Sequence, residues 1–152
     1  MALGAVTGTI PVASKWSAGL IEETQGYYTV GAAVAVGDTI TFTNIIPAGG
    51  VQIISTRIQI PKLDTNATPT ATLLLGDATD DNRFIDAVSA GWDDETSYVT
   101  YDSNVTPSAT VGVGYIYTAA TSLVLKVGGT MATAASTGHI ALWVRYRCVG
   151  NV

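Results

Sequence analysis

The stretch that decides the fold runs from Ala71 to Ala90 and reads ATLLLGDATDDNRFIDAVSA. It opens with a strand-like segment over residues 72–75, which breaks at Gly76 and Asp77 into an acidic loop. After Arg83 the chain returns to apolar residues. Short apolar segments separated by Gly and Asp are typical of β-strands joined by turns. We therefore predict a strand, an acidic turn and a second strand at this point.

One cation lies among the carboxylates of this turn. Arg83 is flanked by Asp77, Asp80, Asp81 and Asp86. A guanidinium group can pair with carboxylates through two parallel hydrogen bonds and so fix the shape of a loop. We therefore expect an ion-pair corner in which Arg83 contacts Asp77, Asp81 and Asp86. Its role would be structural, so Arg83→Ala is expected to destabilise the corner without abolishing any chemistry.

The same carboxylates are also a weak candidate for a metal site. Asp77, Asp80 and Asp81 carry the hard oxygen ligands that Ca²⁺ prefers. Their spacing does not match an EF-hand loop, and Arg83 beside them can neutralise their charge. We therefore expect no bound metal and no other cofactor.

Patterns of alternating residues extend this interpretation to most of the chain. No stretch has helical periodicity, and about eight short strands are punctuated by Gly, Pro and Asp. This predicts an all-β fold, an antiparallel double-sheet sandwich of the jelly-roll type. An immunoglobulin-like sandwich is the alternative, although the Cys–Trp–Cys pattern of that fold is absent. The strands are expected over residues 28–36, 39–45, 51–60, 72–75, 98–101 and 139–149, with a hairpin over 112–118 and 122–127.

The first 26 residues are small, polar and weakly patterned. We interpret residues 1–26 as an N-terminal arm and residues 27–152 as a single β-sandwich domain. Trp16 and Ile21 are large apolar residues in this otherwise soft segment. They are the positions at which the arm would pack on a partner.

The last predicted strand has two different faces. Its alternation places Trp143, Arg145 and Arg147 together, opposite a face of apolar residues that ends at Cys148. Tryptophan and arginine are enriched at the energetic centres of interfaces. We therefore expect Trp143, Arg145 and Arg147 to form part of a partner surface, as does Trp92, which precedes three acidic residues. A buried, inert thiol is expected at Cys148.

Composition bears on the class of function. Only 12% of the 152 residues are charged, about half of the roughly 25% that is average for soluble domains. Such a surface suits either a protein inside an assembly or a stable monomer with a Thr-rich exterior. A net charge of −5 argues against nucleic-acid and anionic membrane partners.

Catalysis is not expected. The chain has one histidine, His139, at the start of the last predicted strand, and no Gly-x-Ser-x-Gly elbow. A strand-edge histidine without a chemical role is the simpler interpretation. We therefore predict that the protein is not an enzyme.

Three segments of the chain carry a recognisable pattern. They are PTATLLLGD with DDNRFI (69–77 and 80–85), YIYTAAT with LVLKV (115–121 and 123–127), and ATAASTG with IALWVRY (132–138 and 140–146). In these segments the chain resembles small structural proteins of tailed-bacteriophage heads. The resemblance covers roughly residues 68–146, and such proteins are taken to be capsid decoration (cement) or minor head proteins.

The resemblance implies a virion protein without catalysis, located on the outer surface of the head. It would clamp neighbouring subunits of the major capsid protein, commonly as a homotrimer. A carbohydrate- or receptor-binding module of a head fibre or tail is the alternative, because Trp16, Trp92 and Trp143 could stack on sugars.

Overall fold

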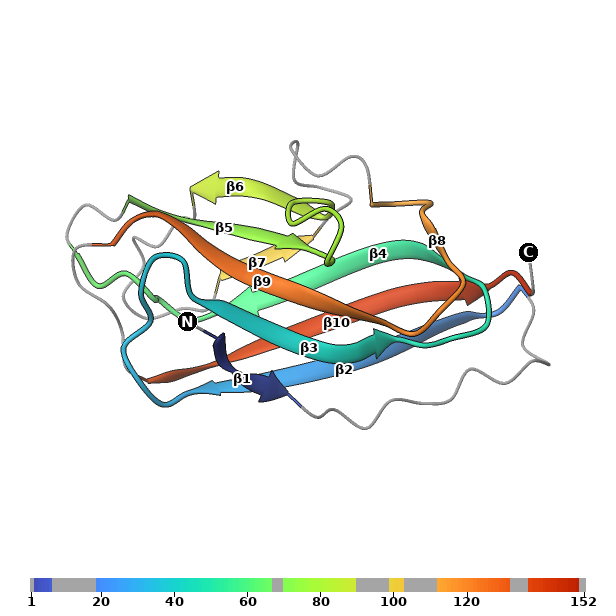
Figure 1. Cartoon of the computed structure of the whole chain (residues 1–152), viewed down its shortest axis with the longest axis horizontal. Coiled ribbons are helices and arrows are strands. Elements are labelled where there is room, and N and C mark those ends of the chain that lie inside the picture. Colours follow the sequence, from blue (N-terminus) through green and yellow to red (C-terminus); the bar gives the residue numbers. More distant parts are fainter. Residues whose placement is uncertain are drawn as a thin grey trace.

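The computed structural model describes residues 2–6, 19–66, 70–89, 99–102, 112–131 and 137–150. Within these ranges the chain forms ten β-strands and no helix (Figure 1). The expected all-β fold is therefore confirmed. This part of the chain holds no helix that is long and apolar enough to cross a membrane. In chain order the strands are β1 (Ala2–Val6), β2 (Ile21–Val30), β3 (Thr39–Ile46), β4 (Val51–Ile60), β5 (Thr70–Gly76), β6 (Ile85–Ser89), β7 (Val99–Asp102), β8 (Ile116–Tyr117), β9 (Thr121–Thr130) and β10 (Gly138–Cys148).

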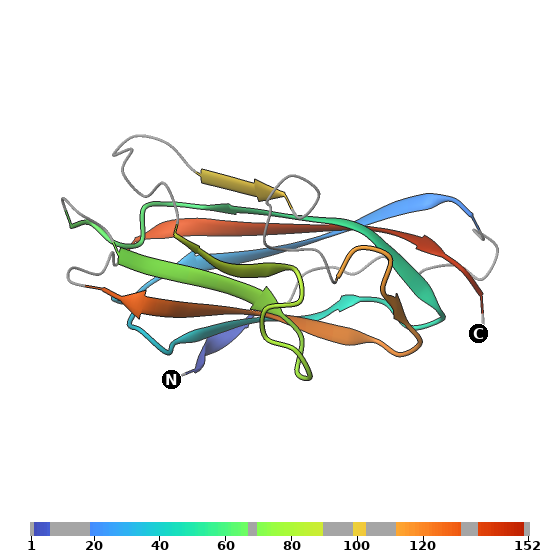
Figure 2. The same cartoon turned by 90° about the horizontal axis from the view of Figure 1, so that it is seen from above.

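The strands form two sheets that pack face to face (Figure 2). Sheet A has the order β1-β3-β9-β5-β6, and sheet B has the order β2-β10-β4-β7, with β8 also paired to β4. The pairing is nested, because β2 pairs with β10, β3 with β9, β4 with β7 and β5 with β6. Rolling up one long antiparallel ribbon produces this order, which is that of a jelly roll. The structure thus follows the predicted jelly roll and not the immunoglobulin-like alternative.

Two strands are added to this eight-stranded frame. β1 runs parallel to β3 at the edge of sheet A, and β8 pairs with the first residues of β4. With these additions the described strands number ten. β8 falls within the strand predicted over residues 112–118, whereas β1 was not expected.

The core lies between the two sheets, because successive side chains of a strand point to opposite faces. In β10 the expected apolar face is buried along its whole length, and Cys148 at its end is buried as predicted. Ile40 and Phe42 of β3 are buried in the same way. The largest fully buried side chains are those of Phe42, Phe84 and Tyr146, surrounded by Ile and Leu from both sheets.

β4 departs from the simple alternation that its sequence suggests. Simple alternation would place Ile54 on the same face as the buried Thr56, Ile58 and Ile60, but Ile54 is only half-buried and Ile53 is fully buried. The pairing with β10 skips Ile54, which is the signature of a β-bulge. The extra residue reverses the alternation along β4 at this point.

The hairpin predicted over residues 112–118 and 122–127 does not form. β8 contains only Ile116 and Tyr117 and pairs with β4 in sheet B, whereas β9 lies between β3 and β5 in sheet A. The short connection at residues 118–120 therefore crosses from one layer to the other. A short loop between alternating segments usually joins neighbours in one sheet, and the sequence does not reveal that this one joins two sheets.

The N-terminal part of the domain also differs from expectation. The strand predicted to begin at Tyr28 begins at Ile21 and pairs with β10 over its whole length. Residues 21–26 therefore belong to sheet B and not to an arm. The prediction missed them because the inward-facing positions there are Thr24 and Gly26, which do not look like core residues. Trp16 and Trp92 lie outside the described residues.

Candidate functional site

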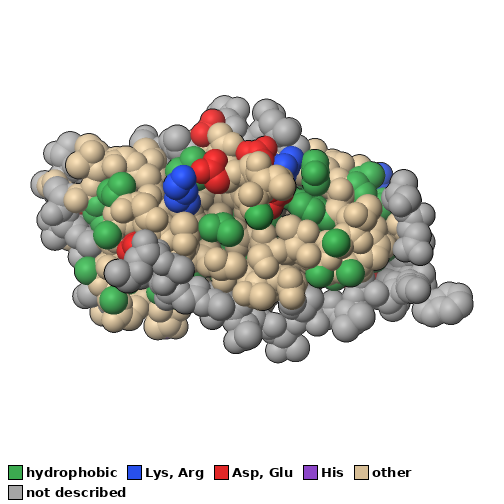
Figure 3. All heavy atoms as spheres, viewed as in Figure 1, with side chains coloured by type: hydrophobic (Ala, Val, Ile, Leu, Met, Phe, Trp, Pro, Cys, Tyr) green, Lys and Arg blue, Asp and Glu red, His purple; other side chains and the backbone are tan. Residues whose placement is uncertain are grey.

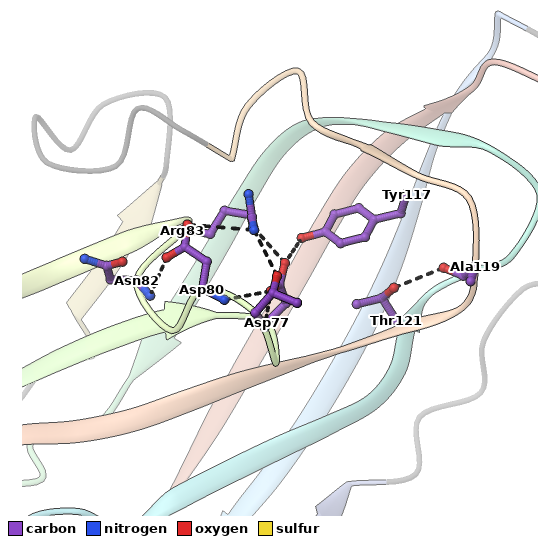
Figure 4. A network of polar contacts seen from close by, with 8 residues as sticks. Asp77, Asp80, Asn82, Arg83, Tyr117, Ala119 and Thr121 are labelled. Carbon is purple, nitrogen blue, oxygen red and sulfur yellow. Dashed lines mark hydrogen bonds and ion pairs between the residues drawn. The ribbon is translucent and has the colours of Figure 1, made fainter. Parts of the chain in front are cut away.

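Asp77 lies at the centre of a buried polar network that begins where β5 ends (Figure 4). Its Oδ1 accepts hydrogen bonds from the backbone N–H of Thr79 (2.8 Å), the Thr79 hydroxyl (2.6 Å) and the Asp80 N–H (3.0 Å). Its Oδ2 accepts from Arg83 Nε at 2.7 Å and from the Tyr117 hydroxyl at 2.6 Å. Both carboxylate oxygens are therefore occupied by donors, in a side chain that is only 3% exposed.

A tight backbone turn places these donors around Asp77. The Asp77 N–H donates to the Asp80 carbonyl at 2.9 Å, and the Phe84 N–H returns to the Leu75 carbonyl at 2.8 Å. Gly76 permits this close approach, because a Cβ at that position would collide with the backbone oxygen of Asp80. The Gly-Asp break in the sequence thus determines the turn and the position of the carboxylate.

Arg83 is held on all sides within this network. Besides its bond to Asp77, its Nη2 donates to the Thr79 hydroxyl at 3.1 Å and lies 3.8 Å from Asp80 Oδ2. The guanidinium carbon lies 4.1 Å from the centre of the Tyr115 ring, which is a cation–π distance. Tyr115 in turn meets Tyr117 edge to face, with ring centres 4.7 Å apart. The Arg83 side chain, only 9% exposed, thus has hydrogen-bond, ion-pair and cation–π partners.

The environment shifts the pKa values of the two central groups in opposite senses. Burial raises the pKa of Asp77, but hydrogen bonds from Thr79, Tyr117 and Arg83 outweigh burial and hold it at about 2, against an ordinary 3.8. Burial, together with the hydrogen bond to Asp77, raises the pKa of Tyr117. Near neutral pH, Asp77 is therefore ionised and Tyr117 keeps its proton, as the bond between them requires.

The network joins the two sheets of the sandwich. Asp77, Thr79 and Arg83 follow β5 of sheet A, whereas Tyr117 belongs to β8, which is paired to β4 of sheet B. Its chemistry is that of a polar cross-link in which the buried charges of Asp77 and Arg83 are paired. Sequence reasoning missed Thr79. It also missed Tyr115 and Tyr117, because both were assigned to a hairpin with β9.

The expected ion-pair corner is confirmed for Arg83 and Asp77. Asp81 instead pairs with Lys126 of β9 at 2.8 Å, and both side chains are largely exposed. Within the part of the chain that the structure describes, the ion pairs of Arg83 are with Asp77 and Asp80, and not with Asp81 or Asp86.

The same geometry bears on the candidate metal site of Asp77, Asp80 and Asp81. Asp77 already accepts five hydrogen bonds, so its lone pairs are committed. Among the described residues, no group of three or more His, Cys, Asp and Glu side chains is arranged to hold a metal ion.

A second candidate site is the outward side of sheet B. We use the term sheet B face for the outward side chains of β2, β10 and β4: Ile21, Glu23, Gln25, Tyr27, Trp143, Arg145, Arg147, Gln52 and Arg57. The register places Trp143 between Gln25 and Arg57, and Arg147 between Ile21 and Gln52. The predicted grouping of Trp143, Arg145 and Arg147 on one face is thus confirmed. Ile21, expected to contact a partner from the arm, joins the same face from β2.

Hydrogen bonds order the side chains along this face. The Tyr27 hydroxyl donates to Gln25 Oε1 at 2.7 Å, and Arg147 Nε donates to Gln52 Oε1 at 2.6 Å. Ile21 and Tyr27 are each 56% exposed. Sequence reasoning missed Glu23, Gln25 and Tyr27, although alternation over residues 21–29 is the signal that could have found them.

His139 lies exposed near the start of β10, where we expected it. Its Nδ1 is 3.2 Å from the Thr29 hydroxyl of β2. This is a cross-strand contact on the surface of sheet B.

Comparison with known proteins gives two matches among solved structures. No family model matches the chain, and no curated protein matches it. A chain of the cyanophage Pam1 capsid asymmetric unit is similar with a TM-score of 0.63 and 25% identity, over 84% of each chain. A chain of the capsid of Ralstonia phage GP4 has a TM-score of 0.64 and 22% identity, over 91% of this chain and 90% of that one.

This chain is similar to chains of phage capsids. The likeness extends over most of both molecules, well beyond the three sequence segments that first indicated it. The resemblance to phage head proteins is therefore confirmed at the level of structure, and it supports a structural role in the virion.

Proposed function

We propose that the chain is a decoration protein of a phage head. It binds the outer surface of the shell and stabilises contacts between neighbouring subunits of the major capsid protein, as a homotrimer. The observation that carries this proposal is the likeness to chains of two phage capsids, at 25% identity in the case of cyanophage Pam1.

The surface of the molecule supports an assembled state. Only 12% of the chain is charged. The sheet B face presents Trp143, Tyr27 and two arginines of β10, which are residue types enriched at interfaces. A trimer binding through three equivalent contacts gains avidity, so each contact with the shell can be weak while the whole complex is held firmly.

The interior supports a mechanical role. A protein that resists movement of the subunits beneath it has to transmit force without deforming. The Asp77 network joins sheet A to sheet B, and the nested strand pairing ties the first strand of the sandwich to the last. The Asp77 network opposes sliding of one layer over the other, and the pairing of β2 with β10 holds sheet B together.

The proposal is tested by adding the purified chain to phage heads that lack it. We expect symmetric occupancy at many copies per head, measured by quantitative gel analysis and by imaging of the heads. We also expect the decorated heads to be disrupted at a higher temperature than bare heads. Failure to bind, or binding of a few copies together with a defined signal on a glycan array, would favour the sugar-binding alternative.

A further inference from the structure

Positive charge is concentrated on one side of an acidic protein. The chain has a net charge of −5 and only seven Lys and Arg residues. Three of these seven, Arg57, Arg145 and Arg147, belong to the sheet B face. Glu23 lies in register with Arg145, and Asp102 of β7 lies in register with Arg57. Arg145 and Arg147 lie at one end of the face, next to exposed Ile21. Glu23 offsets part of the charge of Arg145, whereas the register neighbours of Arg147, Ile21 and Gln52, are uncharged.

The negative charge lies elsewhere. The acidic loop, residues 77–82, joins β5 to β6 at the far side of the sandwich from the sheet B face. Figure 3 shows acidic side chains gathered over the upper part of the sheet A side. The side chains of Asp80 and Asp81 are 31% and 55% exposed, and Lys126 offsets part of their charge.

Both surfaces are ordered before any partner binds. The loop is held by the Asp77 network, and Arg147 is held by Gln52. Little side-chain entropy is therefore lost when the two surfaces meet, which favours their association. Aromatic, arginine and apolar side chains on the sheet B face provide the desolvated centre that charge pairs alone do not supply.

We propose that the sheet B face of one copy binds the acidic loop of a second copy. Because the two surfaces are different and lie on opposite sheets, the contact is head-to-tail, and repetition through a rotation that closes gives a ring. An isologous contact between two sheet B faces would instead bring like charges together. This inference rests on the proposed homo-oligomer and assigns the surfaces through which it forms.

Charge reversal tests the assignment, with molar mass from light scattering as the readout. The wild-type chain is expected at a multiple of 15.7 kDa. Arg145→Glu with Arg147→Glu, and separately Asp80→Arg with Asp81→Arg, are each expected to weaken self-association by roughly tenfold or more. All four substitutions in one chain recreate opposite charges and are expected to restore the oligomer.

Matched controls separate this contact from a general effect of charge. Lys62→Glu reverses one positive charge beyond the opposite end of β4, the same change per residue as in the Arg145 and Arg147 variants, and is expected to leave the mass unchanged. Circular dichroism and urea unfolding show that each variant is folded. Added salt should dissociate the wild-type oligomer, because exposed charges are screened within about 10 Å at 0.1 M.

Three outcomes would overturn the proposed contact. They are a monomeric wild-type chain at all concentrations, an oligomer insensitive to both pairs of reversals, and a fourfold variant that stays monomeric although folded. Binding to phage heads is measured separately with the same variants. An insensitive oligomer that still decorates heads would refute only this contact, whereas an oligomer that binds no heads would refute only the proposed function.

Discussion

At the scale of single residues, Asp77 accepts five hydrogen bonds from the turn, from Arg83 and from Tyr117. A buried charge is costly unless it is paired and hydrogen-bonded. Removing one partner of such a pair leaves the other charge buried and uncompensated, which costs far more than the pair itself contributes. Among the described residues, Asp81 is the natural contrast, because it is exposed and accepts one hydrogen bond, from Lys126.

We predict that Asp77→Asn lowers the free energy of unfolding by about 3–5 kcal/mol, because Arg83 loses its buried counter-charge. Arg83→Ala should act in the same direction. The matched control is Asp81→Asn, for which the loss should be only about 0–1 kcal/mol, since its pair with Lys126 is exposed. Urea unfolding followed by tryptophan fluorescence measures both, and equal losses would contradict the structural role of the network.

The loss of stability in Asp77→Asn should depend on pH. The pKa of Asp77 is about 2 in the folded chain against 3.8 ordinarily. Since the folded pKa is the lower one, the stabilisation is fully present above pH 3.8 and is lost as the pH falls towards about 2. The difference in unfolding free energy between wild type and Asp77→Asn should therefore shrink across this window and stay constant at higher pH. A difference that does not change there would contradict this assignment.

At the scale of elements, turns and bulges decide where the strands go. The bulge at Ile54 changes which residues of β4 face the core, and residues 118–120 carry the chain from sheet B to sheet A. Gly76 has a similar importance, because the loop that follows β5 folds back against it. The atoms nearest to an added Cβ at this position belong to the backbone, so rotating a neighbouring side chain could not make room for it.

We predict that Gly76→Ala destabilises the fold by about 1–3 kcal/mol, the usual cost of forcing extra atoms into a packed site. The added Cβ would meet the backbone of Asp80 and Asp81, which cannot move without breaking the Asp77 network. Gly31→Ala is the control, because its Cβ would have no atom within 4 Å. Thermal unfolding of the two variants measures the difference, and a Gly76→Ala variant as stable as Gly31→Ala would contradict the tight turn.

At the scale of the whole molecule, the jelly roll depends on pairs of strands that are distant in sequence. β2 forms ten register pairs with β10, from Val30 and Gly138 to Ile21 and Arg147. These pairs form the edge of sheet B, and β2 also covers Phe42, whose ring lies against Gly26. Loss of β2 would therefore expose both an unpaired strand and part of the core.

We predict that a chain beginning at Gly19 still unfolds cooperatively, although it lacks β1. A chain beginning at Gly31 should not unfold cooperatively. In that chain β10 loses β2, one of its two neighbours in sheet B, and Thr24, Gly26 and Val30 no longer close the core. Near-UV circular dichroism during urea unfolding distinguishes the two. Cooperative unfolding of the shorter chain would show that β2, including the residues up to 26 that the sequence assigned to the arm, is dispensable for the fold.

Local patterns in the sequence determined the class of fold and, within the Asp77 network, the ion pair between Asp77 and Arg83. Strict alternation identified the buried and exposed faces of β10, and the Gly-Asp break beside Arg83 identified the ion pair with Asp77, because these features depend on neighbours in the chain. Tertiary structure alone decided the rest. Tyr117 reaches Asp77 across 40 residues, the bulge at Ile54 exists only relative to β10, and residues 21–26 become a strand only because β10 lies beside them. Such contacts are set by how the two sheets stack and pair, which no local pattern of side chains encodes.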